Sequence, residues 1–376
     1  MTSEIKEKTR VTTILGTRPE IIRLSEIIKK FDLHFSHRLF FSSQNRELFV
    51  GMNFFDELGV RQPDTIMENT STSTAEFLAS LLVEVERELT INRPDAVVIL
   101  GDTNTSLAAI IVKKLGIPIY HLEAGNRSFD SNVPEEVNRT IVDHISDFNL
   151  AYSHKAESNL LSEGLDSRNC IVIGTPLREV MEANFNRFEE SNILSELNLT
   201  AKEYFLVSAH RQENIDNPVR LAELLQTLNS VAENFAVPVI VTTHPRLKSM
   251  LRNVSIKTNS LINFVTPLTF CDYCKLQLNA RVVLSDSGSI SEESALLNFK
   301  AITLRDSIER PEALEAGAIL MSGLNANQVL SAINFVESKS QPSPIPTDYL
   351  IGNSSDRVIN FILSTHHVRD FWSGIR

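Results

Sequence analysis

Several carboxylates in the first half of this sequence directly follow or interrupt short apolar runs. Asp102 comes directly after one run, Glu123 interrupts another, and Glu135 and Glu136 open a helical pattern. Carboxyl groups gathered in a partly dry crevice raise one another's pKa, so one of them can accept or donate a proton near neutral pH. We therefore predict acid–base chemistry from this set. The competing interpretations are a helix cap for Asp102 and a complement to the helix dipole for Glu135 and Glu136.

The second half offers residues of a different kind at the corresponding places. Ser287, Gly288 and Ser289 open a helix after an apolar run, so their free N–H groups favour a phosphate. Glu293 lies further along that helix, where it could accept hydrogen bonds from a ribose diol, and Arg310 could hold a phosphate in bidentate fashion. This set suits a nucleotide diphosphate. Taken singly, the residues would be an ordinary helix cap and a surface ion pair.

The elements that position these residues are strands alternating with helices. The apolar runs are short and rich in β-branched residues, and amphipathic stretches separate them, which is typical of a parallel sheet with helices on both faces. Ligands of such sheets bind beyond the carboxyl ends of the strands. We expect strands at 11–15, 38–41, 96–100, 117–122, 148–151, 170–173, 204–207, 237–241, 262–265, 282–284, 301–304 and 318–321, and helices at 19–30, 74–89, 106–115, 134–145 and 356–364.

The length and the rhythm of these elements indicate two domains. At 376 residues the chain is too long for one ordinary core. The strand pattern restarts after a polar stretch at 182–200. We predict an α/β fold with a carboxylate-bearing domain at 1–178, a phosphate-binding domain at 179–354, and a last helical segment at 355–376 that returns to the first domain.

Composition excludes several classes of function. Apolar residues make up 42% and charged residues 22%, values typical of a folded globular chain, and the formal net charge is −11. A nucleic-acid or anionic-membrane binder needs a basic surface instead. No apolar run approaches the roughly 18 residues of a membrane span, and the charged start does not resemble a signal peptide. We therefore expect a cytoplasmic protein with no nucleic-acid or membrane partner.

The three cysteines point to a reducing compartment, because they cannot build a disulfide framework. Cys271 and Cys274 have the spacing of a half zinc site, but no second pair or suitably spaced histidine accompanies them. We interpret them as core residues of a helix capped by Thr269 and predict no metal site. His121 is expected to shape the end of the strand that carries Glu123.

Seven motifs in order resemble those of bacterial UDP-N-acetylglucosamine 2-epimerases. They are GTRPE (16–20), GDT (101–103), HLEAG (121–125), PEEVNR (134–139), HRQEN (210–214), DSG (286–288) and ERPEA (309–313). The resemblance runs from about residue 11 to the C-terminus. It implies two Rossmann-like domains of the glycosyltransferase-B type, an active site in the cleft between them, no cofactor, and a homodimer.

The resemblance also implies a mechanism and roles for individual residues. A base removes the proton at C2 of the sugar while UDP leaves C1, and UDP adds back after C2 is reprotonated from the other face. The residues implied to be catalytic are Asp102, Glu123, Glu135 and His210. Those implied to bind the UDP-activated N-acetyl amino sugar are Arg18, Arg23, Gln44, Arg139, Arg211, Ser287, Gly288, Glu293 and Arg310.

Three departures from the family pattern refine this prediction. Ser289 stands where a second glycine is common, and Arg23 stands where lysine is common. The loop NRSFD (126–130) with VPEE (133–136) is most similar to the branch that makes UDP-N-acetyl-L-fucosamine from UDP-2-acetamido-2,6-dideoxy-L-talose.

Other functions remain open at this stage. An epimerase could act instead on UDP-N-acetylglucosamine, giving UDP-N-acetylmannosamine, or on a UDP-diacetamido-uronic acid. A glycosyltransferase of the same fold would have no use for several carboxylates around C2. A non-catalytic sensor would be expected to lack Asp102, Glu123 or Glu135, all of which are present.

Overall fold

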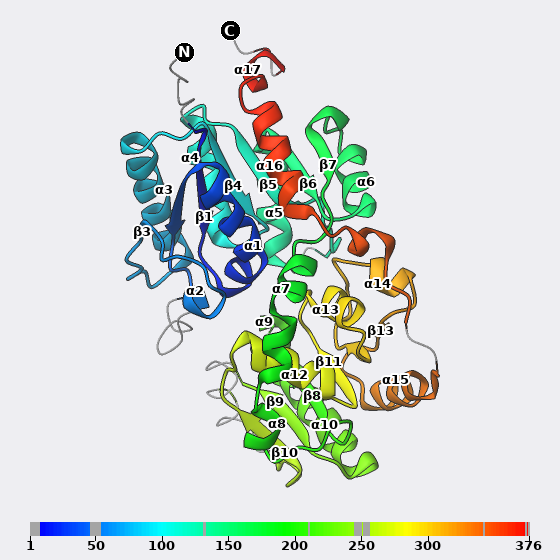
Figure 1. The fold of residues 1–376 in the computed structure, drawn as a ribbon. Coiled ribbons are helices and arrows are strands. Elements are labelled where there is room, and N and C mark those ends of the chain that lie inside the picture. Colours follow the sequence, from blue (N-terminus) through cyan, green and yellow to red (C-terminus); the bar gives the residue numbers. More distant parts are fainter. Residues whose placement is uncertain are drawn as a thin grey trace. The chain divides into compact units, whose positions relative to one another are not determined.

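Two parallel sheets organise the chain in a computed structural model that describes residues 8–45, 54–130, 133–209, 211–243, 250, 256–340, 343–372 and 374 (Figure 1). The first unit comprises residues 1–180 and 348–376, and the second comprises residues 181–347. The chain passes from the first unit to the second within helix α7 (Leu177–Glu190). No described helix is both long enough and apolar enough to cross a membrane.

The sheet of the first unit has seven parallel strands in the order β3-β2-β1-β4-β5-β6-β7. They are β1 (Arg10–Leu15), β2 (Ser36–Phe41), β3 (Thr65–Ile66), β4 (Ala96–Leu100), β5 (Ile119–Ala124), β6 (Phe148–Ala151) and β7 (Cys170–Val172). Every residue of β4, β5 and β6 is buried, as a sheet covered on both faces requires. The strands predicted at 96–100 and 148–151 are confirmed with those bounds.

Amphipathic helices cover this sheet. They are α1 (Arg18–His34), α2 (Phe54–Glu57), α3 (Thr74–Ile91), α4 (Ala109–Lys114), α5 (Pro134–Ile145) and α6 (His154–Ser162), with short 3₁₀ turns η2 (Asn104–Ala108) and η3 (Ser167–Asn169). Helix α3 shows the principle, since Phe77, Leu81, Val85 and Leu89 recur every four residues and enter one apolar core. The helix predicted at 106–115 is wrong in its first turns, which are 3₁₀.

The C-terminal segment belongs to the first unit. It consists of η4 (Thr347–Leu350), α16 (Ser354–Thr365) and α17 (Arg369–Trp372). Lys30 Nζ of α1 lies 2.7 Å from Asp356 Oδ1. The buried hydroxyls of Tyr120 and Thr365 are 2.7 Å apart, so α16 is fastened to β5 as well as to α1.

The sheet of the second unit has six parallel strands in the order β10-β9-β8-β11-β12-β13. They are β8 (Phe205–Ser208), β9 (Val239–Thr242), β10 (Ile262–Val265), β11 (Val282–Ser285), β12 (Ala301–Thr303) and β13 (Leu320–Met321). The α/β class with two Rossmann-like sheets is therefore confirmed.

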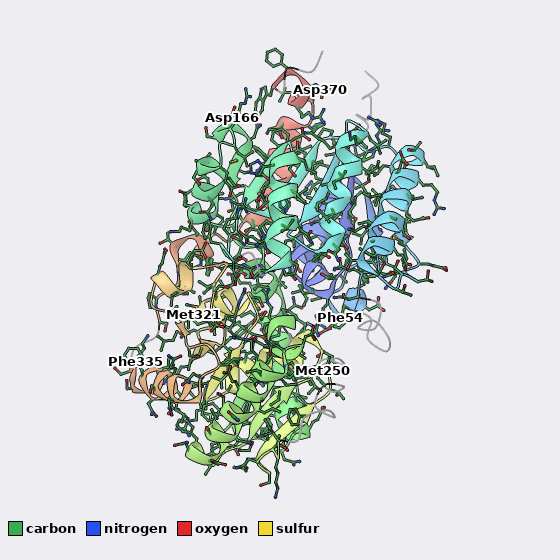
Figure 2. The ribbon with its side chains drawn as sticks, turned by 180° about the vertical axis from the view of Figure 1, so that it is seen from behind. Phe54, Asp166, Met250, Met321, Phe335 and Asp370 are labelled. Carbon is green, nitrogen blue, oxygen red and sulfur yellow. The ribbon has the colours of Figure 1, made fainter. Side chains whose placement is uncertain are left out.

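The helices of the second unit are α8 (Ile193–Glu196), α9 (Gln212–Ile215), α10 (Pro218–Phe235), α12 (Phe270–Asn279), α13 (Ile290–Leu297), α14 (Glu312–Glu315) and α15 (Ala326–Ser338). Helices α10 and α15 add leucine, isoleucine and valine side chains to the core around β8 and β11. On the outer side of α15, Phe335 and the neighbouring Met321 are partly exposed (Figure 2).

Candidate functional site

Two of the predicted carboxylates lie together at one edge of the first sheet. Strands β4 and β5 are neighbours, with Leu100 paired to Leu122, so Asp102 and Glu123 leave adjacent strands at the same end. A Cβ added at Gly101 would lie 3.8 Å from Glu123 Oε1, which shows that the turn before Asp102 faces Glu123. The reasoning from parallel strand ends therefore holds for this pair.

Arginines, which the argument from carboxylates alone left out, lie beside both acids. Arg139 of α5 is 1% exposed, and its Nη2 forms an ion pair with Asp102 and lies 3.5 Å from Glu123 Oε1. On the other side, Arg23 Nε of α1 lies 3.5 Å from Glu123 Oε2. The cluster therefore contains two carboxylates and two guanidinium groups, so the acids have basic partners as well as one another.

Glu123 has an unusual backbone conformation. Its φ is +64°, in the left-handed region, and the register between β5 and β6 shifts between Leu122 and Ala124. A non-glycine residue in this conformation costs about 1–2 kcal/mol, and such strain is concentrated at functional sites. The irregularity turns the Glu123 side chain out of the regular alternation of the strand. The carboxylate is nevertheless buried, at 4% exposure.

Glu135 and Glu136, at the start of α5, have different surroundings. Glu136 accepts hydrogen bonds from the N–H and the hydroxyl of Ser128, both at 2.9 Å, so it fastens the loop that follows Glu123. Glu135 is half-buried. Asn138, one turn further along α5, donates to the Asp102 carbonyl at 2.9 Å. Of the two acids, Glu136 is the one whose side chain holds the neighbouring loop.

A further buried carboxylate, Glu20, ties the first loop to this edge of the sheet. It accepts hydrogen bonds from the N–H groups of Gly16 and Thr17, both at 2.7 Å, and from the Thr103 hydroxyl at 2.8 Å. Burial raises the pKa of Glu20 to about 7, against the opposing effect of these hydrogen bonds. Glu20 thus links the residue before Arg18 to the residue after Asp102.

Two other predicted binding residues of the first unit have structural partners. The Arg18 guanidinium lies over the ring of Phe54, 4.4 Å from its centroid. Gln44 Oε1 accepts from the N–H and the hydroxyl of Thr105, both at 2.9 Å, so it connects the loop after β2 to the 3₁₀ turn η2. Both side chains are half-buried.

The second unit concentrates guanidinium groups around the start of α13. A Cβ added at Gly288 would lie 3.1 Å from Arg310 Nη1, 3.6 Å from Arg211 Nη2 and 3.7 Å from Arg305 Nη1. The hydroxyls of Ser287 and Ser289 are 2.9 Å apart just before the helix. A glycine at this point leaves room for a ligand to approach the backbone, as a phosphate site requires.

Two carboxylates hold these arginines in place. Glu309 Oε1 accepts from Arg211 at 2.8 Å and from Arg305 at 2.9 Å, and Glu292 lies 3.3 Å from Arg310. Three guanidinium groups and these two carboxylates thus lie around the start of α13. Arg305 is 1% exposed, and its Nε and Nη2 atoms have no hydrogen-bond partner in the described residues.

Arg305, Glu309 and Glu292 were assigned no role from the sequence, although Glu309 begins the ERPEA motif. The available signal was their position in the segment after β12 and in the first turn of α13. Glu293, which was predicted, is half-buried and accepts a hydrogen bond from Gln277 Nε2 at 2.5 Å. His210 lies outside the described residues.

The remaining sequence expectations concern cysteine and metal. Cys271 and Cys274 are buried and unbridged in α12, and the Thr269 hydroxyl accepts from the Asp272 N–H at 3.1 Å, so the prediction of core cysteines in a capped helix is confirmed. Within the described ranges, no group of three or more histidine, cysteine, aspartate or glutamate side chains has the arrangement of a metal site.

Two more distant proteins, with different activities in their names, are also similar to this chain. A UDP-2,3-diacetamido-2,3-dideoxy-D-glucuronate 2-epimerase of Pseudomonas aeruginosa is 28% identical over 327 residues, covering 86% of this chain and 91% of that protein. A glycosyltransferase of Rickettsia africae, 12% identical with a TM-score of 0.54, covers 97% of this chain and 98% of that one. The second likeness shows the fold alone.

Nearer relatives decide the family. Residues 29–363 match the family model for UDP-N-acetylglucosamine 2-epimerase. The enzyme of that name from Methanocaldococcus jannaschii is 35% identical over 366 residues, covering 94% of this chain and 98% of that protein. Its structure in complex with UDP-GlcNAc and UDP superposes with a TM-score of 0.88 at 34% identity, covering 95% of this chain and 100% of that one. The structure of a UDP-N-acetylglucosamine 2-epimerase from Rickettsia bellii also gives a TM-score of 0.88, at 37% identity, covering 97% of this chain and 98% of that one. This chain therefore belongs to the UDP-N-acetylglucosamine 2-epimerase family, whose members are isomerases.

Proposed function

We propose that this chain inverts C2 of a UDP-activated N-acetyl amino sugar without hydrolysing it, and that its product is UDP-N-acetyl-L-fucosamine. The observation that supports the reaction most directly is the pair Asp102 and Glu123 at adjacent strand ends, flanked by Arg139 and Arg23. Relatives described as UDP-N-acetylglucosamine 2-epimerases, one of them solved with UDP-GlcNAc and UDP, support the substrate class.

In the proposed reaction, a carboxylate accepts the C2 proton while the bond between C1 and the UDP oxygen breaks. The electron pair of the C–H bond forms the C1–C2 double bond, which leaves a 2-acetamidoglucal and UDP. A proton then reaches C2 from the opposite face, and the UDP oxygen adds back to C1. The reaction needs acid–base groups on both faces of C2, for which Asp102, Glu123 and Glu135 are the candidates.

The departing UDP needs a positive clamp that holds it until it adds back. Arg211, Arg305 and Arg310 around Gly288 supply one in the second unit, where burial makes each charge more effective than it would be in water. We assign the diphosphate to these arginines and to the start of α13, and the ribose to Glu293. His210 is proposed to act beside them.

The loop after Glu123 supports the choice of product. Asn126 and Arg127 are buried, Ser128 is fastened to Glu136, and Phe129 is 80% exposed with a φ of +54°. The base of the loop is therefore buried and hydrogen-bonded, and one aromatic side chain of the loop is exposed. Because NRSFD is most similar to the 6-deoxy branch of the family, we propose a sugar without a 6-hydroxyl group.

The second candidate is a UDP-diacetamido-uronic acid, which the Pseudomonas aeruginosa relative favours by its name. A C6 carboxylate would need a further cation in the sugar site. A panel assay separates these candidates. UDP-2-acetamido-2,6-dideoxy-L-talose, UDP-N-acetylglucosamine and the diacetamido-glucuronate are each incubated with the protein in deuterated water.

We expect deuterium at C2 of the 6-deoxy sugar, with turnover at least tenfold faster than for the other two. Deuterium in a different sugar would overturn the product assignment alone, and deuterium in none of them would overturn the epimerase function. Glu123→Gln should keep UDP affinity but lower exchange at C2 at least about a hundredfold, the usual contribution of a general acid or base. Glu88→Gln is the matched control, since Glu88 of α3 pairs with Arg38 and Thr65 instead, at 2.8 and 2.9 Å.

A further inference from the structure

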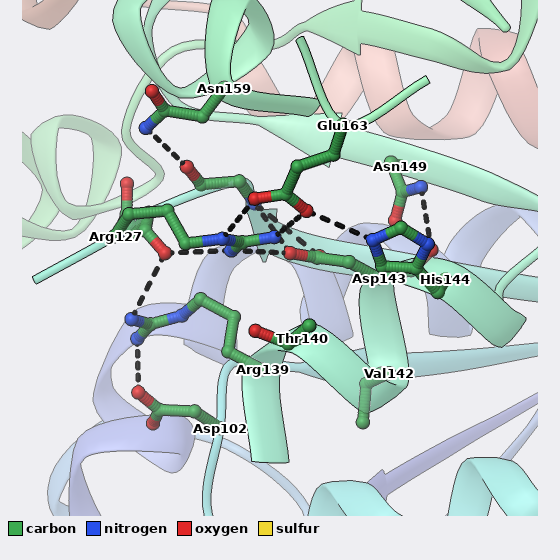
Figure 3. Close-up of polar contacts among 12 residues, drawn as sticks. Asp102, Arg127, Arg139, Thr140, Val142, Asp143, His144, Asn149, Asn159 and Glu163 are labelled. Carbon is green, nitrogen blue, oxygen red and sulfur yellow. Dashed lines mark hydrogen bonds and ion pairs between the residues drawn. The ribbon is translucent and has the colours of Figure 1, made fainter. Parts of the chain in front are cut away.

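Figure 3 shows a chain of charged side chains, Asp143, Arg127, Glu163 and His144, that the mechanism above does not use. Its centre is Asp143 of α5, which is fully buried, as is His121 of β5. Asp143 accepts from His121 Nδ1 at 2.8 Å and from the Gly125 N–H at 3.2 Å, and it lies 2.7 Å from Arg127 Nη1.

The other nitrogen of the His121 ring reaches the turn that carries Asp102. His121 Nε2 lies 2.8 Å from the carbonyl oxygen of Gly101. Both partners of the ring, the Asp143 carboxylate and the Gly101 carbonyl, are hydrogen-bond acceptors. His121 therefore joins Asp143 to the residue directly before Asp102.

The same carboxylate also holds the chain beyond Glu123. The Gly125 N–H that donates to Asp143 lies two residues after Glu123, whose left-handed backbone needs support from its surroundings. A Cβ at Gly125 would lie 2.2 Å from the Ala156 carbonyl oxygen, so the backbone is enclosed on that side as well. Asp143 thus contacts the segment that carries Glu123 directly, and it reaches the segment that carries Asp102 through the ring of His121.

The carboxylates of this network, Asp143 and Glu163, each have basic side chains as partners. Burial alone would raise the pKa of Asp143, but the hydrogen bond and charge of His121 and the charge of Arg127 hold it below its usual range. Arg127 also donates to Glu163 at 2.7 Å, and Glu163 accepts from His144 at 2.9 Å near the surface. Asp143 therefore lies between the His121 ring and the Arg127 guanidinium group.

We propose that Asp143 and His121 are positioning residues that set the Asp102 and Glu123 carboxylates relative to one another for proton transfer at C2. This inference rests on the proposed function. Neither side chain is assigned a contact with substrate. Both act through the backbone, His121 on the Gly101 carbonyl and Asp143 on the Gly125 amide. Their loss should slow the chemical step while UDP binding, assigned to the second unit, stays unchanged.

The same strand offers a matched control at its other end. Asp147 accepts from the N–H of Ile119, the first residue of β5, at 2.9 Å. It also has two cationic partners, Lys113 at 2.7 Å and Arg369 at 3.0 Å, and its side chain is 3% exposed. Asp147 thus resembles Asp143 in burial, charge and backbone contact but lies away from Asp102 and Glu123.

The test compares Asp143→Asn with Asp147→Asn in the full chain. Turnover at saturating UDP-sugar, KM, UDP affinity and thermal midpoint are measured for both variants. We expect Asp143→Asn to lower kcat at least tenfold with KM and UDP affinity within threefold of the native values. Asp147→Asn should keep kcat within twofold of the native value even if its thermal midpoint falls as far as that of Asp143→Asn.

Two results would overturn the proposal, namely an Asp143→Asn variant with kcat within twofold of the native value, or an equal loss of kcat in Asp147→Asn. A native protein without C2 exchange on any sugar would instead refute the proposed function. If Asp143→Asn does not fold, His121→Gln is compared with His121→Leu. Glutamine can still donate to the Gly101 carbonyl, so it should turn over at least fivefold faster than leucine at equal UDP affinity, and equal rates would contradict the proposal.

Discussion

Replacing Glu20 by glutamine should remove a loss of stability that the native protein undergoes as the pH rises. The Glu20 carboxyl group is 2% exposed, and its burial raises the pKa from the usual 4.5 to about 7. The native state therefore holds this proton more tightly than the unfolded chain does. Stability from this group is fully present below about pH 4.5, falls between pH 4.5 and 7, and is constant above pH 7.

The size of the effect follows from the two pKa values. A difference of about 2.5 units at about 1.4 kcal/mol per unit gives about 3.4 kcal/mol over the whole range, of which about 2.5 kcal/mol falls between pH 5 and pH 8. Glutamine does not ionise, so it does not contribute this slope. Its amide oxygen can accept from Gly16 and Thr17 as Glu20 Oε2 does, and its amide group can donate to the Thr103 hydroxyl.

The assay is urea unfolding of both proteins at pH 5, 6, 7 and 8, followed by tryptophan fluorescence. Trp372 is the only tryptophan and lies in α17, in the same unit as Glu20, so its signal reports that unit. The variant should gain about 2.5 kcal/mol relative to the native protein between pH 5 and pH 8. Glu76→Gln is the control, because hydrogen bonds from Thr72 lower the pKa of Glu76 and its titration lies below this window. If the native and Glu20→Gln stabilities change in parallel from pH 5 to pH 8, the reasoning about burial is refuted.

Two substitutions of glycine test the close approaches of the backbone. Gly125→Ala should destabilise the first unit by at least about 3 kcal/mol in urea unfolding, because φ is +80° and the new Cβ would lie 2.2 Å from the Ala156 carbonyl oxygen. Gly164→Ala, with φ of +89° and no atom within 4 Å, should cost only about 1 kcal/mol, and equal costs would contradict the steric argument. Gly288→Ala should weaken UDP binding about tenfold by calorimetry, since its Cβ would crowd Arg310 Nη1 at 3.1 Å and occupy the space assigned to phosphate. Gly352→Ala, whose Cβ would lie 3.5 Å from Arg178 Nε, is the matched control, and equal UDP affinity in the two variants would remove Gly288 from the site.

Much of the fold could be predicted from the pattern of apolar runs. The errors in the predicted bounds have local causes. The helix at 134–145 and the strands at 96–100, 148–151 and 262–265 have the predicted bounds. The buried runs of β4 and β6 each begin directly after an aspartate, Asp95 and Asp147 respectively. The strand expected to end at 122 continues to Ala124, because a backbone irregularity at Glu123 lets a charged residue lie inside it. Strand β3 was missed because its two residues have no apolar run to reveal them.

The candidate site was predictable to the extent that it depends on strand ends. Asp102 and Glu123 could be placed together because parallel neighbours end at one edge. The ion pairs of Arg139 and the contact between Asp143 and His121 could not be predicted, because they depend on which side chains of α5 face the sheet. A signal was present in the sequence, since Arg139, Val142 and Asp143 recur at helical spacing and all three are buried. Charged residues on the apolar face of a helix indicate buried partners.

Helix α5 accordingly does more than cover the first sheet. In successive turns it presents Glu136 to the loop after Glu123, Asn138 to the carbonyl of Asp102, Arg139 to both acids, and Asp143 to the ring of His121. A helix is rigid along its length, so these contacts fix the strand ends relative to one another as one body. The chain as a whole is acidic, yet arginine or the His121 ring contacts the carboxylates of this cluster, and three arginines surround Gly288. Net charge thus describes the surface, while the charges paired inside each unit determine what it can bind.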